Sequence, residues 1–213
     1  MQPFTTLTSV AIPLDIAKVD TGMIVPGRFQ RLPRRPGHND YARVFLHDLR
    51  FDEQENPRAD FILNQSVYQG ASILVTGPDF GCGSSREAAA FATLDFGVRA
   101  LIGASIADVY RGNCMQNGVL PITLPANVVN QLMRDLQAQP GAKITVDLPA
   151  QQVTLPDGTV HGFDIDAARK ERLVKGLDDV GVTLTHLDAI RAFEARYHAA
   201  TPWLTPITKE RVA

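Results

Sequence analysis

The sequence predicts an α/β fold with a mixed sheet, and two patterns along the chain carry that prediction. Between residues 70 and 137, short apolar runs of strand length alternate with longer segments of helical periodicity. Strands separated by helices pair in parallel through right-handed crossovers. After Pro140-Gly141 the pattern becomes short strands separated by turns, which is typical of antiparallel pairing. Together the two halves predict a layered or barrel-like domain whose sheet contains both kinds of strand pairing.

Each element follows from its own local pattern. The segment 7–26 is expected to form a strand, a turn and a return to extended chain that ends at Pro26. The strands expected next are 71–76, 98–102 and 119–124, and the helices between and after them are 85–96, 105–115 and 127–137. Antiparallel strands are expected at 143–148, 151–155 and 160–165, followed by a helix that Asp166 caps and that ends at Lys175, and by a helix at 186–198.

Length and charge define the general class of protein. The chain has 213 residues, which fits one domain, and we place that domain at residues 1–200. Residues 201–213 contain two prolines and no periodicity, so we expect a flexible C-terminal tail. A net charge of −2 gives no reason to expect binding to nucleic acid or to an anionic membrane. No apolar stretch approaches the ~20 residues of a membrane helix, and the first residues lack a signal-peptide pattern, so the cytoplasm is the expected location.

The candidate metal ligands are few. Cys82 and Cys114 are the two cysteines, and zinc or an iron–sulfur cluster takes about four ligands. The five histidines show no metal spacing, so we expect them at the surface or as helix caps. We therefore expect no metal in this chain. Cys82 is predicted to be a small buried thiol and Cys114 to pack on a helix.

The chemistry of the chain is concentrated at residues 80–87, whose sequence is FGCGSSRE and which lie between a predicted strand and a predicted helix. Ser84 and Ser85 precede a helix N-terminus, where free N–H groups and the helix dipole favour an anion. Arg86 adds a planar fork that matches a carboxylate. These residues favour a site for a small carboxylate or phosphate. The alternative is that Ser84 or Ser85 is only an N-cap, with Glu87 in the first turn.

A second candidate region is the polar loop 27–40, which contains two prolines, two glycines and four arginines. The prolines and glycines exclude a regular helix or a central strand. A long loop in a compact domain is either functional or a solvated, flexible connection, and the residues alone leave both interpretations open.

The run FGCGSSRE resembles the signature of the aconitase-superfamily swivelling domain, which occurs as the separate small subunit of isopropylmalate dehydratases. Further stretches that resemble this family are VAIPLD at 10–15, VDT at 19–21, IVP at 24–26, FILN at 61–64, YQGASIL at 68–74, SIADVYRGN at 105–113 and GLDDVGVTL at 176–184. The resemblance covers roughly residues 5–197. It implies an α/β fold of the aconitase swivelling type.

The resemblance also implies an activity. The family's members are hydro-lyases that isomerise or (de)hydrate a 2- or 3-hydroxy dicarboxylate, with leucine biosynthesis as the expected pathway. By position, Ser84 would be the base that removes the proton next to a carboxylate, while Ser85 and Arg86 would bind substrate. A loop arginine should bind a second carboxylate, and Arg35 fits that position best, with Arg28, Arg31 and Arg34 as rivals.

The implied cofactor and partner go together. The family's iron–sulfur cluster lies on a large subunit, so this chain would carry no cofactor and would be active only in a heterodimer with that subunit. The cluster would bind the leaving hydroxyl, and the small subunit would supply the base.

Two positions depart from the family pattern. Gly22 stands where the family has a second aspartate in Asp-Thr-Asp, and Ala88 stands where the signature continues with histidine. The arginine-rich loop with its two prolines is also unusual. These departures keep two alternatives open: a dehydratase subunit for another malate derivative, such as dimethylmalate or citramalate/citraconate, and a non-catalytic regulatory or assembly paralogue.

Overall fold

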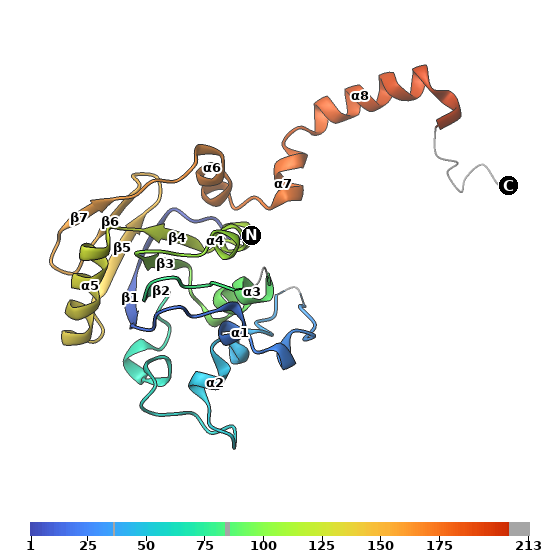
Figure 1. The fold of residues 1–213 in the computed structure, drawn as a ribbon. Coiled ribbons are helices and arrows are strands. Elements are labelled where there is room, and N and C mark those ends of the chain that lie inside the picture. The colour runs from blue at the N-terminus through green and yellow to red at the C-terminus, as the bar shows by residue number, and fades with distance from the viewer. Residues whose placement is uncertain (36, 84–85, 205–213) are drawn as a thin grey trace. The chain divides into compact units, whose positions relative to one another are not determined.

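The computed structural model describes residues 1–35, 37–83 and 86–204, and its contacts divide the chain into two compact units, Met1–Gly176 and Leu177–Ala213 (Figure 1). The single domain placed at residues 1–200 and its flexible tail remain predictions. Among the described helices, none combines the length and the apolar character that crossing a bilayer requires.

The first unit is built on a seven-stranded sheet with the order β4-β3-β2-β1-β5-β6-β7. Its strands are β1 (Thr6–Leu14), β2 (Ile73–Thr76), β3 (Ala100–Gly103), β4 (Leu120–Thr123), β5 (Lys143–Asp147), β6 (Gln152–Thr154) and β7 (Val160–Gly162). Strands β1 to β4 pair in parallel, and β1, β5, β6 and β7 pair antiparallel. The mixed sheet predicted from the sequence is therefore confirmed.

Strand β1 joins the two halves of the sheet. Its first half, from Thr6 to Val10, pairs with β5, and its second half, from Ala11 to Leu14, pairs with β2. Strand β1 has nine residues and is longer than β2 and β5, so its first half can pair with one of them and its second half with the other. The carboxyl end of β1 is thus part of the parallel half, where βα loops gather on one edge of the sheet.

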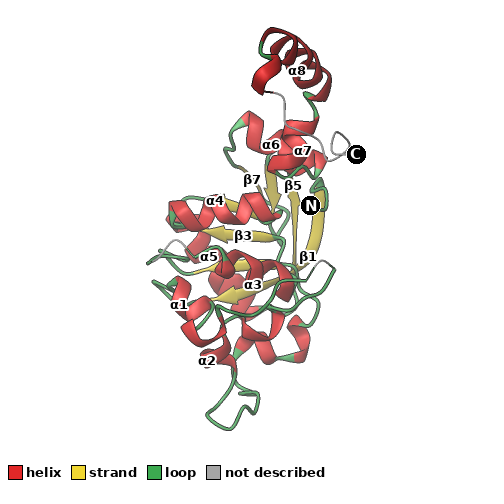
Figure 2. Ribbon diagram, turned by 90° about the vertical axis from the view of Figure 1, so that its right-hand side faces the viewer, coloured by secondary structure: helices red, strands yellow, loops and turns green. Residues whose placement is uncertain are grey.

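Helices cover both faces of the parallel half (Figure 2). They are α3 (Ala88–Phe96), α4 (Asp108–Asn117) and α5 (Ala126–Ala138), and a fourth helix, α6 (Ala167–Lys175), follows β7. Side chains of β2 alternate between two cores, with Leu74 in the core of α3 and α4, and with Ile73 and Val75 in the core of α5. This alternation follows from the period of two in a strand. The predicted order of strands and helices is confirmed, and the predicted cap at Asp166 accepts from Arg169 N at 3.1 Å.

The segment between β1 and β2 contains two short helices, α1 (Thr21–Ile24) and α2 (His47–Arg50), and several 3₁₀ turns. The extended return predicted before Pro26 is wrong, because Asp20 Oδ1 accepts hydrogen bonds from Gly22 N and Met23 N and starts a helical turn. A four-residue helix is too short to produce a periodic pattern in the sequence.

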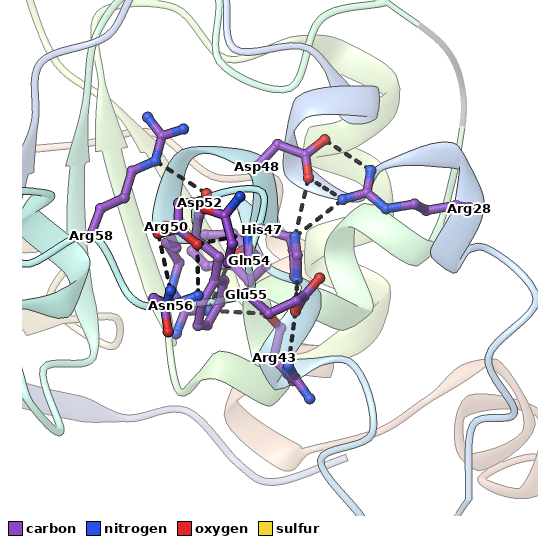
Figure 3. Close-up of polar contacts among 12 residues, drawn as sticks. Arg28, Arg43, His47, Asp48, Arg50, Asp52, Gln54, Glu55, Asn56 and Arg58 are labelled. Carbon is purple, nitrogen blue, oxygen red and sulfur yellow. Dashed lines mark hydrogen bonds and ion pairs between the residues drawn. The ribbon is translucent and has the colours of Figure 1, made fainter.

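His47 is buried and is not the N-cap of α2, so the prediction that the histidines lie at the surface or cap helices is wrong for this residue. Its Nε2 lies 3.1 Å from Glu55 Oε2 and its Nδ1 lies 3.1 Å from Asp48 Oδ1, as Figure 3 shows. The rings of Phe29 and Phe51 lie at centroid distances of 4.7 and 4.9 Å from its ring. The histidine therefore joins polar and aromatic groups that are separated in the sequence.

The second unit consists of α7 (Asp179–Leu184), α8 (Leu187–Ala200) and the 3₁₀ turn Pro202–Leu204. Helix α8 confirms the prediction for 186–198, whereas α7 was not predicted. Asp178 caps α7 by accepting from Gly181 N at 2.7 Å. Residues 205–213 of the predicted tail lie outside the described residues.

Candidate functional site

The signature turn, residues 80–87, follows β2 at the carboxyl edge of the parallel strands. Two isolated parallel bridges hold it between the neighbouring loops, one from Asp20 to Cys82 and one from Phe80 to Ile106. The hydrogen bonds are Gly81 N to Val19 O at 2.7 Å, Thr21 N to Cys82 O at 2.9 Å and Ala107 N to Phe80 O at 3.0 Å. Ligands of open α/β sheets bind outside the carboxyl ends of the strands, which is the position of this turn.

The underside of the signature turn rests on Tyr110. Phe80 is fully buried and its ring meets that of Tyr110 edge-on at 5.7 Å. Gly81 has φ +77°, and a Cβ added there would lie 2.2 Å from Tyr110 Cδ1. The residue must therefore be glycine for two independent reasons, its backbone conformation and the closeness of the ring.

The hydroxyl of Tyr110 is held by a residue of α3. Its hydroxyl lies 2.6 Å from Thr93 Oγ1, and Thr93 donates to Ala89 O at 2.8 Å. Because the threonine proton goes to that carbonyl, Tyr110 donates to Thr93. Burial raises the pKa of Tyr110 far above its ordinary value, and burial raises the pKa of the neighbouring Cys114 thiol to about 12. Both groups are therefore neutral packing partners, and the packing role predicted for Cys114 is confirmed.

The two predicted serines of the site, Ser84 and Ser85, lie outside the described residues. The roles of Ser84 as base and of Ser85 in substrate binding therefore stay predictions. The helix after them begins at Ala88, with Glu87 as its N-cap. The alternative that one of the serines is an N-cap also concerns residues outside the described ones and stays a prediction.

Arg86 is exposed at the end of the signature turn. With its amide oxygen turned toward the guanidinium, Gln30 accepts hydrogen bonds from Arg86 Nη1 at 3.0 Å and from Nε at 2.9 Å. A Cβ added to Gly22 would lie 3.3 Å from Arg86 Nη1. Among the residues described, no carboxylate forms an ion pair with Arg86. An exposed guanidinium without an acidic partner is suited to bind an anionic ligand.

The arginines of loop 27–40 differ in their partners. Arg35, the predicted second substrate ligand, pairs with Asp40, to which its backbone N and its Nε donate at 2.9 and 3.3 Å. This pairing lowers the pKa of Asp40 to about 2. Arg28 forms a bidentate pair with Asp48, which lowers the pKa of that carboxyl.

Arg34 is connected to the signature turn through Asn117. Its guanidinium lies 3.8 Å above the ring of Phe91 and donates to Asn117 Oδ1 at 3.1 Å. Asn117 in turn donates to Glu87 Oε1 at 3.0 Å. Arg31 is exposed and has no partner in the described part of the chain. Which arginine binds substrate stays a prediction, and these contacts make Arg34 a stronger rival to Arg35.

A shallow pocket of about 380 Å³ opens beside Cys82, between the three loops at the edge of the sheet. Lys18, Asp79 and Asp108 contribute polar groups to its wall. Asp79 donates its N–H to Ser105 Oγ and accepts from the same hydroxyl, both at 2.8 Å. Cys82 is half-buried rather than buried as predicted, because it faces this pocket.

Within residues 1–35, 37–83 and 86–204, no group of three or more acidic, histidine or cysteine side chains is placed to hold a metal ion. The donor chemistry also does not fit an iron–sulfur cluster, because a cluster takes about four thiolates. This chain has two cysteines, and the pKa of one of them is raised to about 12 by complete burial.

Comparison with known proteins gives consistent matches along the chain. The model of the aconitase C-terminal domain matches residues 1–127, and a model named LeuD_N matches 130–167. The model of the C-terminal domain of the 3-isopropylmalate dehydratase small subunit matches 179–207. A 3-isopropylmalate dehydratase small subunit from Parvibaculum lavamentivorans is 47% identical over 96% of this chain and 100% of its own length. The corresponding protein of Ruegeria sp. is 44% identical, with the same shares covered.

A solved structure supports the fold. The crystal structure of 3-isopropylmalate dehydratase (leuD) from Methanocaldococcus jannaschii superposes with a TM-score of 0.62, at 20% identity, over 89% of this chain and 99% of that one. The predicted α/β fold of the aconitase type is confirmed by this likeness and by the aconitase match. Sequence reasoning missed Gln30, Tyr110 and Asn117, for which local sequence offers no signal.

Proposed function

Because this chain belongs to the 3-isopropylmalate dehydratase small-subunit family, we propose that it is the small subunit of a hydro-lyase that isomerises a 3-isopropylmalate-like hydroxy dicarboxylate in leucine biosynthesis. Its relatives, 44% and 47% identical over nearly the whole chain, carry that name. One structural observation supports the proposal most strongly. The exposed Arg86, without an acidic partner among the described residues, stands at the carboxyl edge of three parallel strands.

In the proposed reaction the small subunit binds a substrate carboxylate and removes a proton. Arg86 would bind the carboxylate through its free N–H donors and stabilise the enolate-like charge that develops next to it. Ser84 would take the proton, which requires a neighbouring cation because a free hydroxyl titrates far above neutral pH. Arg86, two positions away in the sequence, would be that cation. Ser85 and one loop arginine, Arg35 or Arg34, would complete the binding of the dicarboxylate.

The leaving hydroxyl would be bound by an iron–sulfur cluster of a large partner subunit. The two thiols of this chain do not suit a cluster, because a cluster takes about four thiolates and Cys114 is buried. The proposal therefore requires a heterodimer in which the signature turn faces a partner that carries the cluster. The cluster, the partner and the substrate are all parts of this proposal.

The test is reconstitution. The small subunit is co-expressed anaerobically with the cluster-bearing large subunit from the same genome, and the purified complex is assayed for hydration of isopropylmaleate. We expect a coloured complex with activity that neither subunit has alone. A complex that forms with its cluster intact and hydrates no unsaturated dicarboxylate would favour the non-catalytic paralogue.

The absence of a side chain at Gly22, next to Arg86, favours a second candidate, a dehydratase for a different malate derivative. A side chain at residue 22 would touch the guanidinium, so its absence changes the surroundings of the carboxylate-binding group. The same complex should then be assayed with dimethylmaleate and citraconate beside isopropylmaleate. If kcat/KM is higher for one of these compounds than for isopropylmaleate, that compound corresponds to the preferred substrate.

A further inference from the structure

Arg86 has a different kind of partner from the two ion-paired arginines of loop 27–40. Arg28 and Arg35 each face a carboxylate, whereas Arg86 faces the neutral amide of Gln30. The carboxylate of Asp20 lies beside Gly22, and its Oδ1 accepts from two backbone N–H groups that begin α1. That acidic group is therefore occupied in capping a helix.

Gly22 explains why no carboxylate reaches Arg86 from α1. A Cβ built on Gly22 would lie 3.3 Å from Arg86 Nη1 and 3.0 Å from Asp20 Oδ1. Any longer side chain at this position would compete with Gln30 for the same edge of the guanidinium. An aspartate there would bring a charge next to the arginine and neutralise it in part. Glycine leaves that edge to Gln30.

Gln30 is well placed to orient the arginine. Its amide oxygen accepts from both Nε and Nη1 of Arg86, so the plane of the guanidinium is fixed by two donors from one edge. The Nη2 group has no partner among the described residues, and its N–H donors point away from the edge that Gln30 binds. A neutral acceptor holds the side chain in this orientation without cancelling its charge.

The turn that carries Gln30 is itself anchored. Gln30 N donates to Gly27 O at 3.3 Å and closes the 3₁₀ turn Gly27–Phe29. Arg28, in the middle of that turn, pairs with Asp48 and also meets His47 Nδ1 at 3.3 Å. Figure 3 shows these three side chains facing one another. The ring of Phe29 packs against the buried His47. The turn that precedes Gln30 is therefore held against α2 by its neighbours Arg28 and Phe29.

We propose that Gln30 is a positioning residue that holds the guanidinium of Arg86 by its Nε and Nη1 edge, and that Gly22 keeps this edge free of a carboxylate. Arg86 then presents Nη2 and its full positive charge to a carboxylate of the substrate. The identity of the ligand in this inference rests on the proposed function, whereas the contact between Gln30 and Arg86 is independent of it.

The first test needs no activity. In the full chain labelled with ¹⁵N, the Arg86 Nε–H signal, assigned by its loss in Arg86→Lys, should be protected from exchange with water. Gln30→Leu should remove that protection, and Gln30→Glu should keep it because the acceptor remains. Equal exchange of Arg86 Nε–H in the wild type and in Gln30→Leu would overturn the inference, whether or not the proposed function is correct.

The second test uses the reconstituted complex. Loss of a hydrogen bond to a charged group corresponds to about a ten- to hundredfold effect. We expect Gln30→Leu to raise KM by about tenfold or more, with a smaller change in kcat. Gln30→Glu should also raise KM, because the added charge neutralises Arg86 although the orientation is kept. A wild-type KM in both variants, in an active complex, would overturn the inference and leave the proposed function standing.

Gly22 supplies the matched pair of variants. Gly22→Ala adds only the Cβ near Nη1. It removes no hydrogen bond to a charged group, so it should change KM by less than about threefold. Gly22→Asp adds the carboxylate and should raise KM well beyond the alanine variant. If the two variants have the same KM, the charge next to Arg86 is without effect, and the role given to Gly22 is wrong.

Discussion

The signature turn and the arginine-rich loop are both candidate parts of one site, yet they are held in different ways. The turn is anchored in the interior, where Phe80 is buried and Gly81 lies against the ring of Tyr110. The loop is held at the surface by ion pairs such as Arg35 with Asp40. Exposed ion pairs contribute little stability, whereas buried packing contributes much. The comparison indicates that residues 80–82 of the turn have a fixed geometry and that the loop can change at low cost.

The largest contrast concerns the two cysteines, one on the signature turn and one beneath it. Burial raises the pKa of Cys114 to about 12, while Cys82 is half-buried beside a pocket. At pH 8 iodoacetamide should label Cys114 about a thousandfold more slowly in the native protein than in urea, because the thiolate is the reactive form. Labelling is followed by peptide mass spectrometry. Equal labelling rates of both cysteines in the native chain would contradict the anchored underside of the turn.

The next effect is on stability and comes from Gly81. Gly81→Ala should lower the free energy of unfolding by about 3 kcal/mol or more, from the left-handed backbone and from overlap with Tyr110. The matched control is Gly97→Ala, where φ is +110° and an added Cβ meets nothing within 4 Å. It should cost only about 1–2 kcal/mol. Urea denaturation measures both, and equal costs would show that Tyr110 does not limit residue 81.

A smaller effect is expected from the hydroxyl that connects α3 and α4 below the turn. Tyr110→Phe removes the 2.6 Å contact with Thr93 and should lower the free energy of unfolding by about 1 kcal/mol. Tyr41→Phe is the counterpart for the arginine loop, because Tyr41 donates to Leu32 O at 2.8 Å. Leu32 is half-buried, so water can replace that bond, and the cost should be about half as large. A larger cost for Tyr41→Phe would reverse the comparison.

The smallest effect concerns the ion pair of the loop. Because Arg35 lowers the pKa of Asp40 to about 2, the pair should contribute above about pH 4 and be lost as the pH falls from there toward 2. A ¹³C titration of the Asp40 carboxyl should therefore have its midpoint near 2. In Arg35→Gln the midpoint should rise toward the ordinary value of about 3.9 and stay below it, because the backbone N–H of residue 35 still donates to the carboxyl. A midpoint near 4 in the wild type would show that Arg35 is not paired with Asp40 in solution.

The sequence predicted those parts of the fold that repeat a pattern. Strands such as Ile73–Thr76 and helices such as Ala126–Ala138 are long enough, or apolar enough, to show their period. The start of α3 was placed too early, at residue 85, whereas the helix begins at Ala88. The turn at Thr21–Ile24 was missed because one capping carboxylate, that of Asp20, determines it.

The candidate site was predicted where it is local in the sequence. The signature turn and Arg86 were identified from one run of residues, and its place between strand β2 and helix α3 is confirmed. The partners of Arg86 and His47 could not be predicted, because they come from loops that only the tertiary fold brings together. Gln30 and Arg86 are far apart in the sequence, and no local pattern relates a glutamine in one loop to an arginine in another.

In the proposed enzyme the signature turn would supply the base and the carboxylate ligand of a two-subunit hydro-lyase. The most direct measurement is kcat for hydration of isopropylmaleate by the reconstituted complex with Ser84→Ala, beside the wild type and Arg86→Lys. We expect Ser84→Ala to lower kcat by about a hundredfold or more, as for loss of a general base, with cluster content unchanged. We expect Arg86→Lys mainly to raise KM, because the bidentate fork is lost. A Ser84→Ala complex with wild-type kcat would exclude Ser84 as the base.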